Sequence, residues 1–266
     1  MDTHCHLDAA VFDDDRNDVI RSAQKAGVNT IVIPAINRNN FTAVKHLAHE
    51  FPGGRYALGI HPMCVPKAHK DDLVELEKAI EQAIDDPRFV AIGEIGLDFF
   101  EPELRQADMH EKQEYFYIQQ LKMAGRYQLP VLLHVRRSQD LLLKQLRRHS
   151  HVGGLAHAFN GSFQQAEHFI DQGFGLGFGG AMTFSRAKQI RRLAAKLPLD
   201  VLVLETDAPD IPPAWLEKGE RNQPHHLARI AHELADLRQL DVEQLIEATN
   251  RNAVQFLPRL ATLNDN

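Results

Sequence analysis

Residues 130–157 read PVLLHVRRSQDLLLKQLRRHSHVGGLAH, with two short apolar segments on either side of a longer amphipathic one. The apolar segments, 130–135 and 152–157, have the short length, the branched side chains and the flanking Pro or Gly of buried strands. The segment between them, 138–149, has the spacing of a helix. Because strands that alternate with helices pair in parallel, this unit predicts an α/β protein.

The same alternation runs along the whole chain. Further strands are expected at 28–34, 55–60, 89–95, 174–179 and 201–205, and further helices at 14–26, 39–51, 71–86, 103–127, 163–172, 186–197, 223–238 and, on the outside, 241–257. With residues 2–6 as the remnant of a first strand, there are eight strand–helix units. This number is typical of a TIM-like (β/α)8 barrel, which we expect to form a single domain over residues 1–266. An open doubly wound sheet is the alternative, but no Gly-x-Gly-x-x-Gly segment follows a strand.

The composition excludes several classes of protein. Of 266 residues, 44% are hydrophobic, which is ample for a core and excludes a disordered chain. No apolar run approaches the roughly 18 residues of a membrane span, and the first residues lack the pattern of a secretory signal. With two cysteines there is no disulfide framework, so we expect a cytoplasmic protein. No long apolar surface stripe stands out, so we expect a monomer.

Histidines and carboxylates gather where the predicted strands end, which is where barrel enzymes place their active residues. The predicted strand ends carry His4, His6, His61, Glu94, Asp98, His134, Arg136, His157, Glu205 and Asp207. A single histidine at a strand end is most often structural, but so many imidazoles and carboxylates are costly to bury together without cations. Such mixed donors suit Zn, Mn, Fe or Co and tolerate Mg. A carboxylate between two sets of histidines can bridge two metals, which is an arrangement for hydrolysis.

Several motifs, in this order, resemble the TatD family of metal-dependent deoxyribonucleases. They are DTHCHLD (2–8), GIHP (59–62), GEIGLD (93–98), LHVR (133–136), HAFNG (157–161) and ETDAP (205–209). The resemblance spans nearly the whole chain and is strongest to the YjjV-type branch. The family usually has a few apolar residues before the first motif, where this sequence has only Met1. We therefore expect either a short first strand or a start upstream of Met1.

The resemblance implies a barrel of the amidohydrolase superfamily with two divalent metal ions, Mg, Mn or Zn. By the family pattern, one metal is held by His4, His6 and Asp207, the other by His134 and His157, and Glu94 bridges them. The implied substrate is DNA, cleaved from the 3′ end with a preference for single strands. We expect a metal-bridging water to lose its proton and attack phosphorus as hydroxide, with Asp207 as the base. Glu205 is either a second catalytic candidate or a partner that holds a ligand histidine.

The candidate substrate contacts are Arg136, Arg221 and His61. Arg136 comes first, because a guanidinium binds phosphate in a bidentate fashion. Arg221 lies in the long connection 208–223, and connections of that length in a barrel often line the mouth. His61 either contacts the substrate or caps the turn that follows it.

These arginines favour a phosphodiester, whereas the net charge of −6 argues mildly against a long polyanion. The same metal centre could instead hydrolyse a small amide, lactone or ester, because the fold alone does not choose the substrate. A binding protein that uses the barrel only as a scaffold is disfavoured by the intact ligand set.

Overall fold

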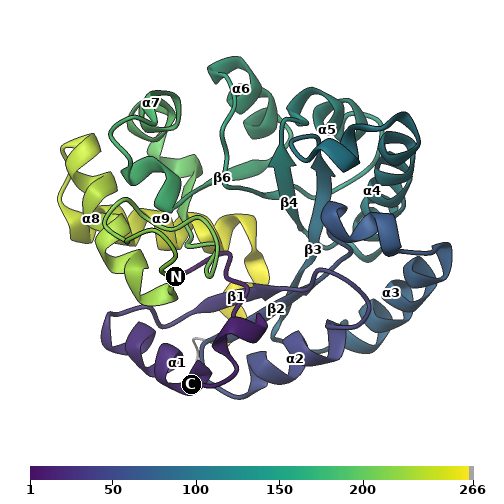
Figure 1. Cartoon of the computed structure of the whole chain (residues 1–266), viewed down its shortest axis with the longest axis horizontal. Coiled ribbons are helices and arrows are strands. Elements are labelled where there is room, and N and C mark those ends of the chain that lie inside the picture. Colours follow the sequence, from purple (N-terminus) through teal and green to yellow (C-terminus); the bar gives the residue numbers. More distant parts are fainter. Residues whose placement is uncertain (264–266) are drawn as a thin grey trace.

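The computed structural model describes residues 1–263. Its seven strands form one parallel sheet in the order of the chain, and the sheet curls round on itself (Figure 1). The strands are β1 (Ile31–Pro34), β2 (Gly54–Leu58), β3 (Phe89–Asp98), β4 (Val131–Arg136), β5 (Gly154–His157), β6 (Phe174–Phe178) and β7 (Leu202–Leu204). Every strand expected after residues 2–6 is present, with ends shifted by a few residues. The architecture is the expected TIM-like barrel.

Residues 2–6 take the place of the first strand and close the sheet. Asp2 forms an isolated parallel bridge with Ile31 of β1. On the other side, the Thr3 N–H donates a hydrogen bond of 3.1 Å to the carbonyl of Leu204 in β7. The expected first strand is therefore reduced to a short segment that is hydrogen-bonded to both edges of the sheet.

The inside of the barrel is divided into two layers. The lower layer, which is nearer the N-terminal ends of the strands, is apolar. It consists of the buried side chains of Val32, Ala57, Ala91, Leu132, Leu155 and Val203. Two residues further along β4, β5 and β7 come His134, His157 and Glu205. Because side chains two apart share a face of a strand, these polar groups stand above the apolar layer at the C-terminal end of the barrel.

Helices surround the sheet (Figure 1). They are α1 (Arg16–Lys25), α2 (Phe41–His49), α3 (Lys70–Ala83), α4 (Ala107–Tyr127), α5 (Gln139–Leu146), α6 (Phe163–Asp171), α7 (Lys188–Lys196), α8 (Leu227–Arg238) and α9 (Val242–Phe256). All the expected helices are found, although separate 3-10 turns at Pro102–Arg105 and Pro224–His226 precede α4 and α8. In the described part of the chain, no helix combines the length and the apolar character needed to cross a membrane.

The last helical residues close the other end of the barrel. Ala253 of α9, together with Leu257 and Leu260 just after it, is buried against the lower apolar layer. The inside of the barrel is thus sealed beneath the polar layer, and the polar groups face the opposite end.

Asp86, in the turn before β3, connects three elements of the fold. Its carboxylate accepts a hydrogen bond of 2.8 Å from the Tyr56 hydroxyl and one of 3.0 Å from the Arg88 N–H. The Nε2 atom of His49 lies 2.9 Å from the same carboxylate. Burial disfavours the charged form of Asp86, but these partners outweigh it and lower the pKa of the carboxyl.

We expect Asp86→Asn to lower the free energy of unfolding by about 1–3 kcal/mol at neutral pH, because the buried Tyr56 and two partly exposed donors lose a charged acceptor. A depressed folded-state pKa contributes stability above the unfolded value of about 4, and this contribution disappears as the pH falls through the folded value. Urea unfolding over a range of pH measures the effect, with the exposed neighbour substitution Asp85→Asn as the control. A difference from wild type that persists in acid would contradict the assignment.

Candidate metal centre

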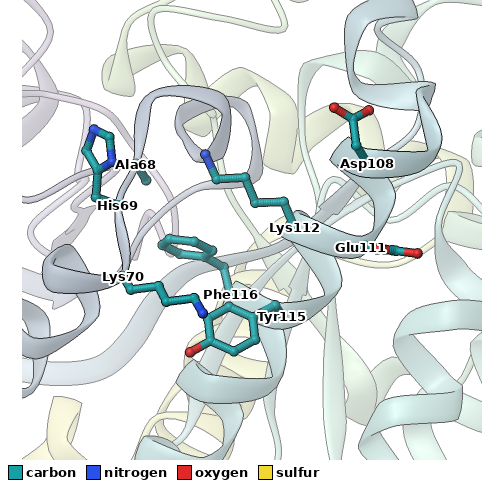
Figure 2. A pocket seen from close by; sticks show the side chains of 8 residues that line it. All are labelled: Ala68, His69, Lys70, Asp108, Glu111, Lys112, Tyr115 and Phe116. Carbon is teal, nitrogen blue, oxygen red and sulfur yellow. The ribbon is translucent and has the colours of Figure 1, made fainter.

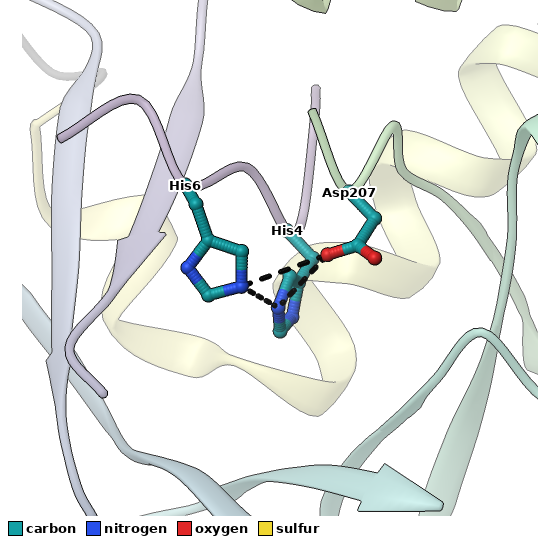
Figure 3. Close-up of side chains that lie close together, drawn as sticks. All are labelled: His4, His6 and Asp207. Atoms are coloured by element: carbon teal, nitrogen blue, oxygen red, sulfur yellow. Dashed lines mark hydrogen bonds and ion pairs between the residues drawn. The ribbon is translucent and has the colours of Figure 1, made fainter. Parts of the chain in front are cut away.

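Glu94, a buried carboxylate on β3, lies in the middle of the polar layer. Its Oε2 atom lies 3.0 Å from Nε2 of His4 and 3.4 Å from Nε2 of His6. The Oδ1 atom of Asp207, which follows β7, lies 3.7 Å from His4 Nε2 and 3.6 Å from His6 Nε2. Figure 3 shows these two imidazoles and the Asp207 carboxylate converging from two segments that are far apart in the sequence.

The other oxygen of Glu94 faces a second set of histidines. Glu94 Oε1 lies 2.9 Å from Nδ1 of His134 and 3.3 Å from Nε2 of His61. It also lies 3.8 Å from Nε2 of His157. The two oxygens of one carboxylate therefore face different imidazoles, although the groups adjoin where the rings of His4 and His157 stack 3.8 Å apart.

The structure brings all the predicted ligand residues together, and their donor atoms fall into overlapping groups. The groups in which the donor atoms lie within 4.8 Å of one another are His4, His6 and Asp207; His4, Glu94 and His157; and His61, Glu94 and His134. The first group is the one that the family pattern implies. The second predicted set is divided between two groups, because His157 lies beside His4 and His61 lies beside His134.

The charges of this cluster fit divalent cations. Burial opposes ionisation of Glu94, yet the surrounding imidazoles hold its pKa well below the usual value. Burial lowers the pKa of these imidazoles, but nearby carboxylates outweigh it at three of them, raising the pKa of His6 to about 9, that of His157 to about 10 and that of His134 above its usual value. Without cations, protons on these rings would have to balance the carboxylates. Metal ions can take the place of those protons, and the nitrogen and oxygen donors are the types that Zn²⁺ or Mn²⁺ prefers and Mg²⁺ tolerates.

Two further carboxylates hold the histidines from behind. Glu205 Oε1 lies 3.1 Å from His157 Nδ1 and accepts a hydrogen bond of 2.6 Å from the Ala158 N–H. Asp98 Oδ2 lies 3.0 Å from His134 Nε2. A carboxylate on the far nitrogen fixes the tautomer and orientation of a ligand imidazole. For Glu205, predicted as a catalytic candidate, this contact favours a positioning role.

The predicted substrate contacts are separated by the structure. His61 caps the turn that follows it, as one of the two alternatives predicted, because its Nδ1 atom accepts a hydrogen bond of 3.1 Å from the Met63 N–H. Its Nε2 atom lies within the cluster, 3.3 Å from Glu94 Oε1, which the sequence argument did not anticipate. Arg136 lies at the edge of the cluster, 3.7 Å from Asp98 Oδ2. Arg221 lies away from it, because its guanidinium is paired with Asp15 and stacked 4.7 Å from the ring of Phe12.

A groove on the outer surface is lined by side chains from the start of α3 and from α4 (Figure 2). It runs between the turn before α3 and the first turns of α4. Its charges are mixed, with Lys70 and Lys112 beside Asp108 and Glu111. None of the clustered donors lines it, so the groove is no part of the candidate metal centre.

A barrel with buried imidazole and carboxylate donors at the C-terminal ends of its strands is the architecture of a metal-dependent hydrolase. The comparison with known families agrees, since the profile of the TatD related DNase family matches residues 1–258. The chain belongs to the TatD family.

Individual relatives support this assignment. The uncharacterized metal-dependent hydrolase YjjV of Escherichia coli is 40% identical over 253 residues, which are 95% of each chain. The deoxyribonuclease TATDN3 of Homo sapiens is 33% identical over 270 residues, covering 99% of this chain and 96% of the relative. The crystal structure of Escherichia coli YjjV superimposes with a TM-score of 0.91 at 39% identity, covering 97% of both chains. The family and the YjjV-type branch predicted from the motifs are both confirmed.

We expect Glu205→Gln to lower the affinity for divalent metal by about 10- to 100-fold, because His157 loses its charged partner. The measurement is calorimetric titration with Zn²⁺ or Mn²⁺, and the control is the exposed substitution Glu217→Gln. Unchanged affinity in a folded Glu205→Gln protein would remove the positioning role.

We also expect Gly177→Ala to weaken metal binding without removing the carboxylate. A Cβ atom at Gly177 would lie 2.1 Å from Glu205 Oε2, so the carboxylate must shift from its present position against His157. If both substitutions act through His157, the double variant Gly177→Ala/Glu205→Gln is no weaker in metal binding than the worse single variant. Additive losses of affinity would show that they act independently.

Proposed function

We propose that this TatD-family protein hydrolyses phosphodiester bonds of DNA as a two-metal 3′–5′ exonuclease with a preference for single strands. The observation that carries the proposal is the position of Glu94, whose two oxygens face two separate groups of donors. A relative named as a deoxyribonuclease, similar over nearly its whole length, supports the choice of substrate.

The donor groups described above would hold the two metal ions. One ion would be bound by His4, His6 and Asp207, which form one of these groups. The other would be bound by His134 and His157, whose rings both lie near Glu94 Oε1, with His61 beside His134 and Glu94 between the two ions. Bound there, two divalent cations supply positive charge to the phosphate and activate water.

Asp207 is placed to take a proton at the border of the two groups. Its Oδ1 atom faces His4 and His6, and its Oδ2 atom lies 3.8 Å from Nε2 of His157. Its side chain is 12% exposed, so it is reached from the open end of the barrel. An Asp207 carboxylate can therefore accept the proton of a water molecule that attacks phosphorus.

Arg136 supplies a fixed positive charge at the rim of the cluster. Its guanidinium lies 3.7 Å from Asp98, the residue that holds His134, and its side chain is 42% exposed. A phosphate oxygen can approach this planar group with two parallel hydrogen bonds. The apolar layer below His134 and His157 excludes water from the lower side of the site.

We expect the wild-type protein, with Mg²⁺ or Mn²⁺, to shorten a 5′-labelled single-stranded DNA oligomer from its 3′ end. Asp207→Asn should lower the rate by at least about 100-fold, because both a ligand and the proton acceptor are changed. A gel time course measures the products, and the surface substitution Asp200→Asn is the control. If neither wild type nor control cleaves DNA although both contain metal, the small amide, lactone or ester becomes the preferred substrate class.

We expect Glu94→Gln to reduce the metal content from about two ions per chain to one or fewer, because the shared carboxylate belongs to both groups. Inductively coupled plasma mass spectrometry after dialysis measures this content. The exposed substitution Glu75→Gln serves as the control. Full metal content in Glu94→Gln would contradict the shared role of the carboxylate.

A further inference from the structure

An exposed aromatic ring beside the metal cluster carries two guanidinium groups. The Cζ atom of Arg136 lies 3.8 Å from the centre of the Phe100 ring, and that of Arg137 lies 4.7 Å from it. Phe100 follows β3 and is 38% exposed, whereas the two arginines stand at the end of the neighbouring strand β4. We call these three residues the Phe100 platform.

The backbone bends so that both arginines reach the same ring. Consecutive side chains of an extended strand point to opposite faces, which would place Arg136 and Arg137 on different sides. Arg137 instead has a φ of 58°, in the left-handed region that branched and long side chains rarely occupy. The next residue anchors this turn, since the buried Ser138 hydroxyl donates a hydrogen bond of 2.6 Å to the Leu97 carbonyl. Such strained conformations are typical of functional sites.

The two guanidinium groups of the platform differ in their partners. Arg136 lies 3.3 Å from the Glu101 carboxylate and 3.7 Å from that of Asp98. Within residues 1–263, the structure gives Arg137 no carboxylate partner, and its side chain is exposed. Two guanidinium groups on one ring repel each other. An anion that binds Arg137 from the solvent side would offset this repulsion.

Asp98 joins the platform to the metal cluster. Its Oδ1 atom accepts a hydrogen bond of 2.7 Å from the Phe100 N–H, which fixes the turn that carries the ring. Its Oδ2 atom lies 3.0 Å from Nε2 of His134. The ring and a candidate metal ligand are thus held by the same carboxylate, and an anion on Arg137 would be a near neighbour of a phosphate at the cluster.

We infer that the Phe100 platform is a subsite for the backbone phosphate that adjoins the scissile bond, so that efficient substrates contain at least one further phosphate. This inference rests on the proposed phosphodiesterase activity. Arg137 contacts the adjoining phosphate, and Phe100 is a positioning residue that holds the guanidinium by a cation–π contact. The exposed part of the ring is left for an unpaired base, which a single strand can offer and a duplex cannot.

The first test measures binding of the Mg²⁺-loaded protein to a fluorescent single-stranded oligonucleotide with hydrolysis-resistant phosphorothioate links. We expect Arg137→Gln to raise the dissociation constant several-fold and to reduce the slope of log K against log salt by about 0.7, the value for one lost phosphate contact on a single strand. Arg137→Lys should restore most of the slope, because it keeps the charge. Arg148→Gln, an equal loss of charge at an exposed arginine beyond the far end of α5, should leave both quantities unchanged.

The second test compares two substrates of the active enzyme. One is a DNA oligonucleotide, and the other is the p-nitrophenyl ester of thymidine monophosphate, which has no adjoining phosphate. We expect Arg137→Gln and Phe100→Leu to raise KM for the oligonucleotide by about tenfold more than for the short ester, as the loss of one charge-assisted contact predicts.

The outcomes separate the two proposals. If the wild-type enzyme cleaves neither substrate, the proposed function fails. If it cleaves both, two results would overturn the subsite. One is an equal slope of log K against log salt for Arg137→Gln and Arg148→Gln, and the other is an equal loss of activity of Arg137→Gln on the two substrates. Thermal melts of Phe100→Leu and Arg137→Gln near that of wild type ensure that a loss reflects the site.

Discussion

The arrangement of this barrel depends on the burial of one carboxylate. Glu94 is charged in a water-poor interior, and an isolated charge of that kind would destabilise the fold by several kcal/mol. Imidazoles from the N-terminal segment lie against one of its oxygens, and imidazoles from β4, β5 and the turn after β2 lie against the other. The strands that carry these rings must therefore end at the same level along the barrel axis. A closed sheet of parallel strands provides this alignment.

The N-terminal segment is the part of the fold in which structure and chemistry are most closely joined. Asp2 accepts hydrogen bonds of 3.0 Å and 2.6 Å from the N–H and the hydroxyl of Thr206. Because Thr206 precedes Asp207, this contact holds His4 beside the carboxylate that completes its donor group. The segment therefore both closes the sheet and positions the candidate ligands His4 and His6, although its regular β-structure is a single bridge.

Periodicity in the sequence predicted the strands and the residues at their ends, because buried parallel strands are short apolar runs and their side chains alternate. It could not predict which polar residues would touch. In an extended strand Glu205 and Asp207 would share a face, yet Asp207 has a φ of 56°. Glu205 contacts the Nδ1 atom of His157, whereas Asp207 faces the Nε2 side of that ring together with His4 and His6. His61 joined the donors, and Arg221 did not, because distances across a barrel and the path of a long loop depend on packing that no local pattern encodes.

The seal that α9 and the residues after it place under the barrel has a consequence for any polymer that enters the site. Because the site is open at one end of the barrel only, a long chain cannot pass right through it as a strand passes through a ring-shaped clamp. Only a free terminus or a sharply bent loop reaches the bottom. Apolar side chains remote from the polar layer, Leu257 and Leu260 among them, complete the packed interior that leaves the site with one opening.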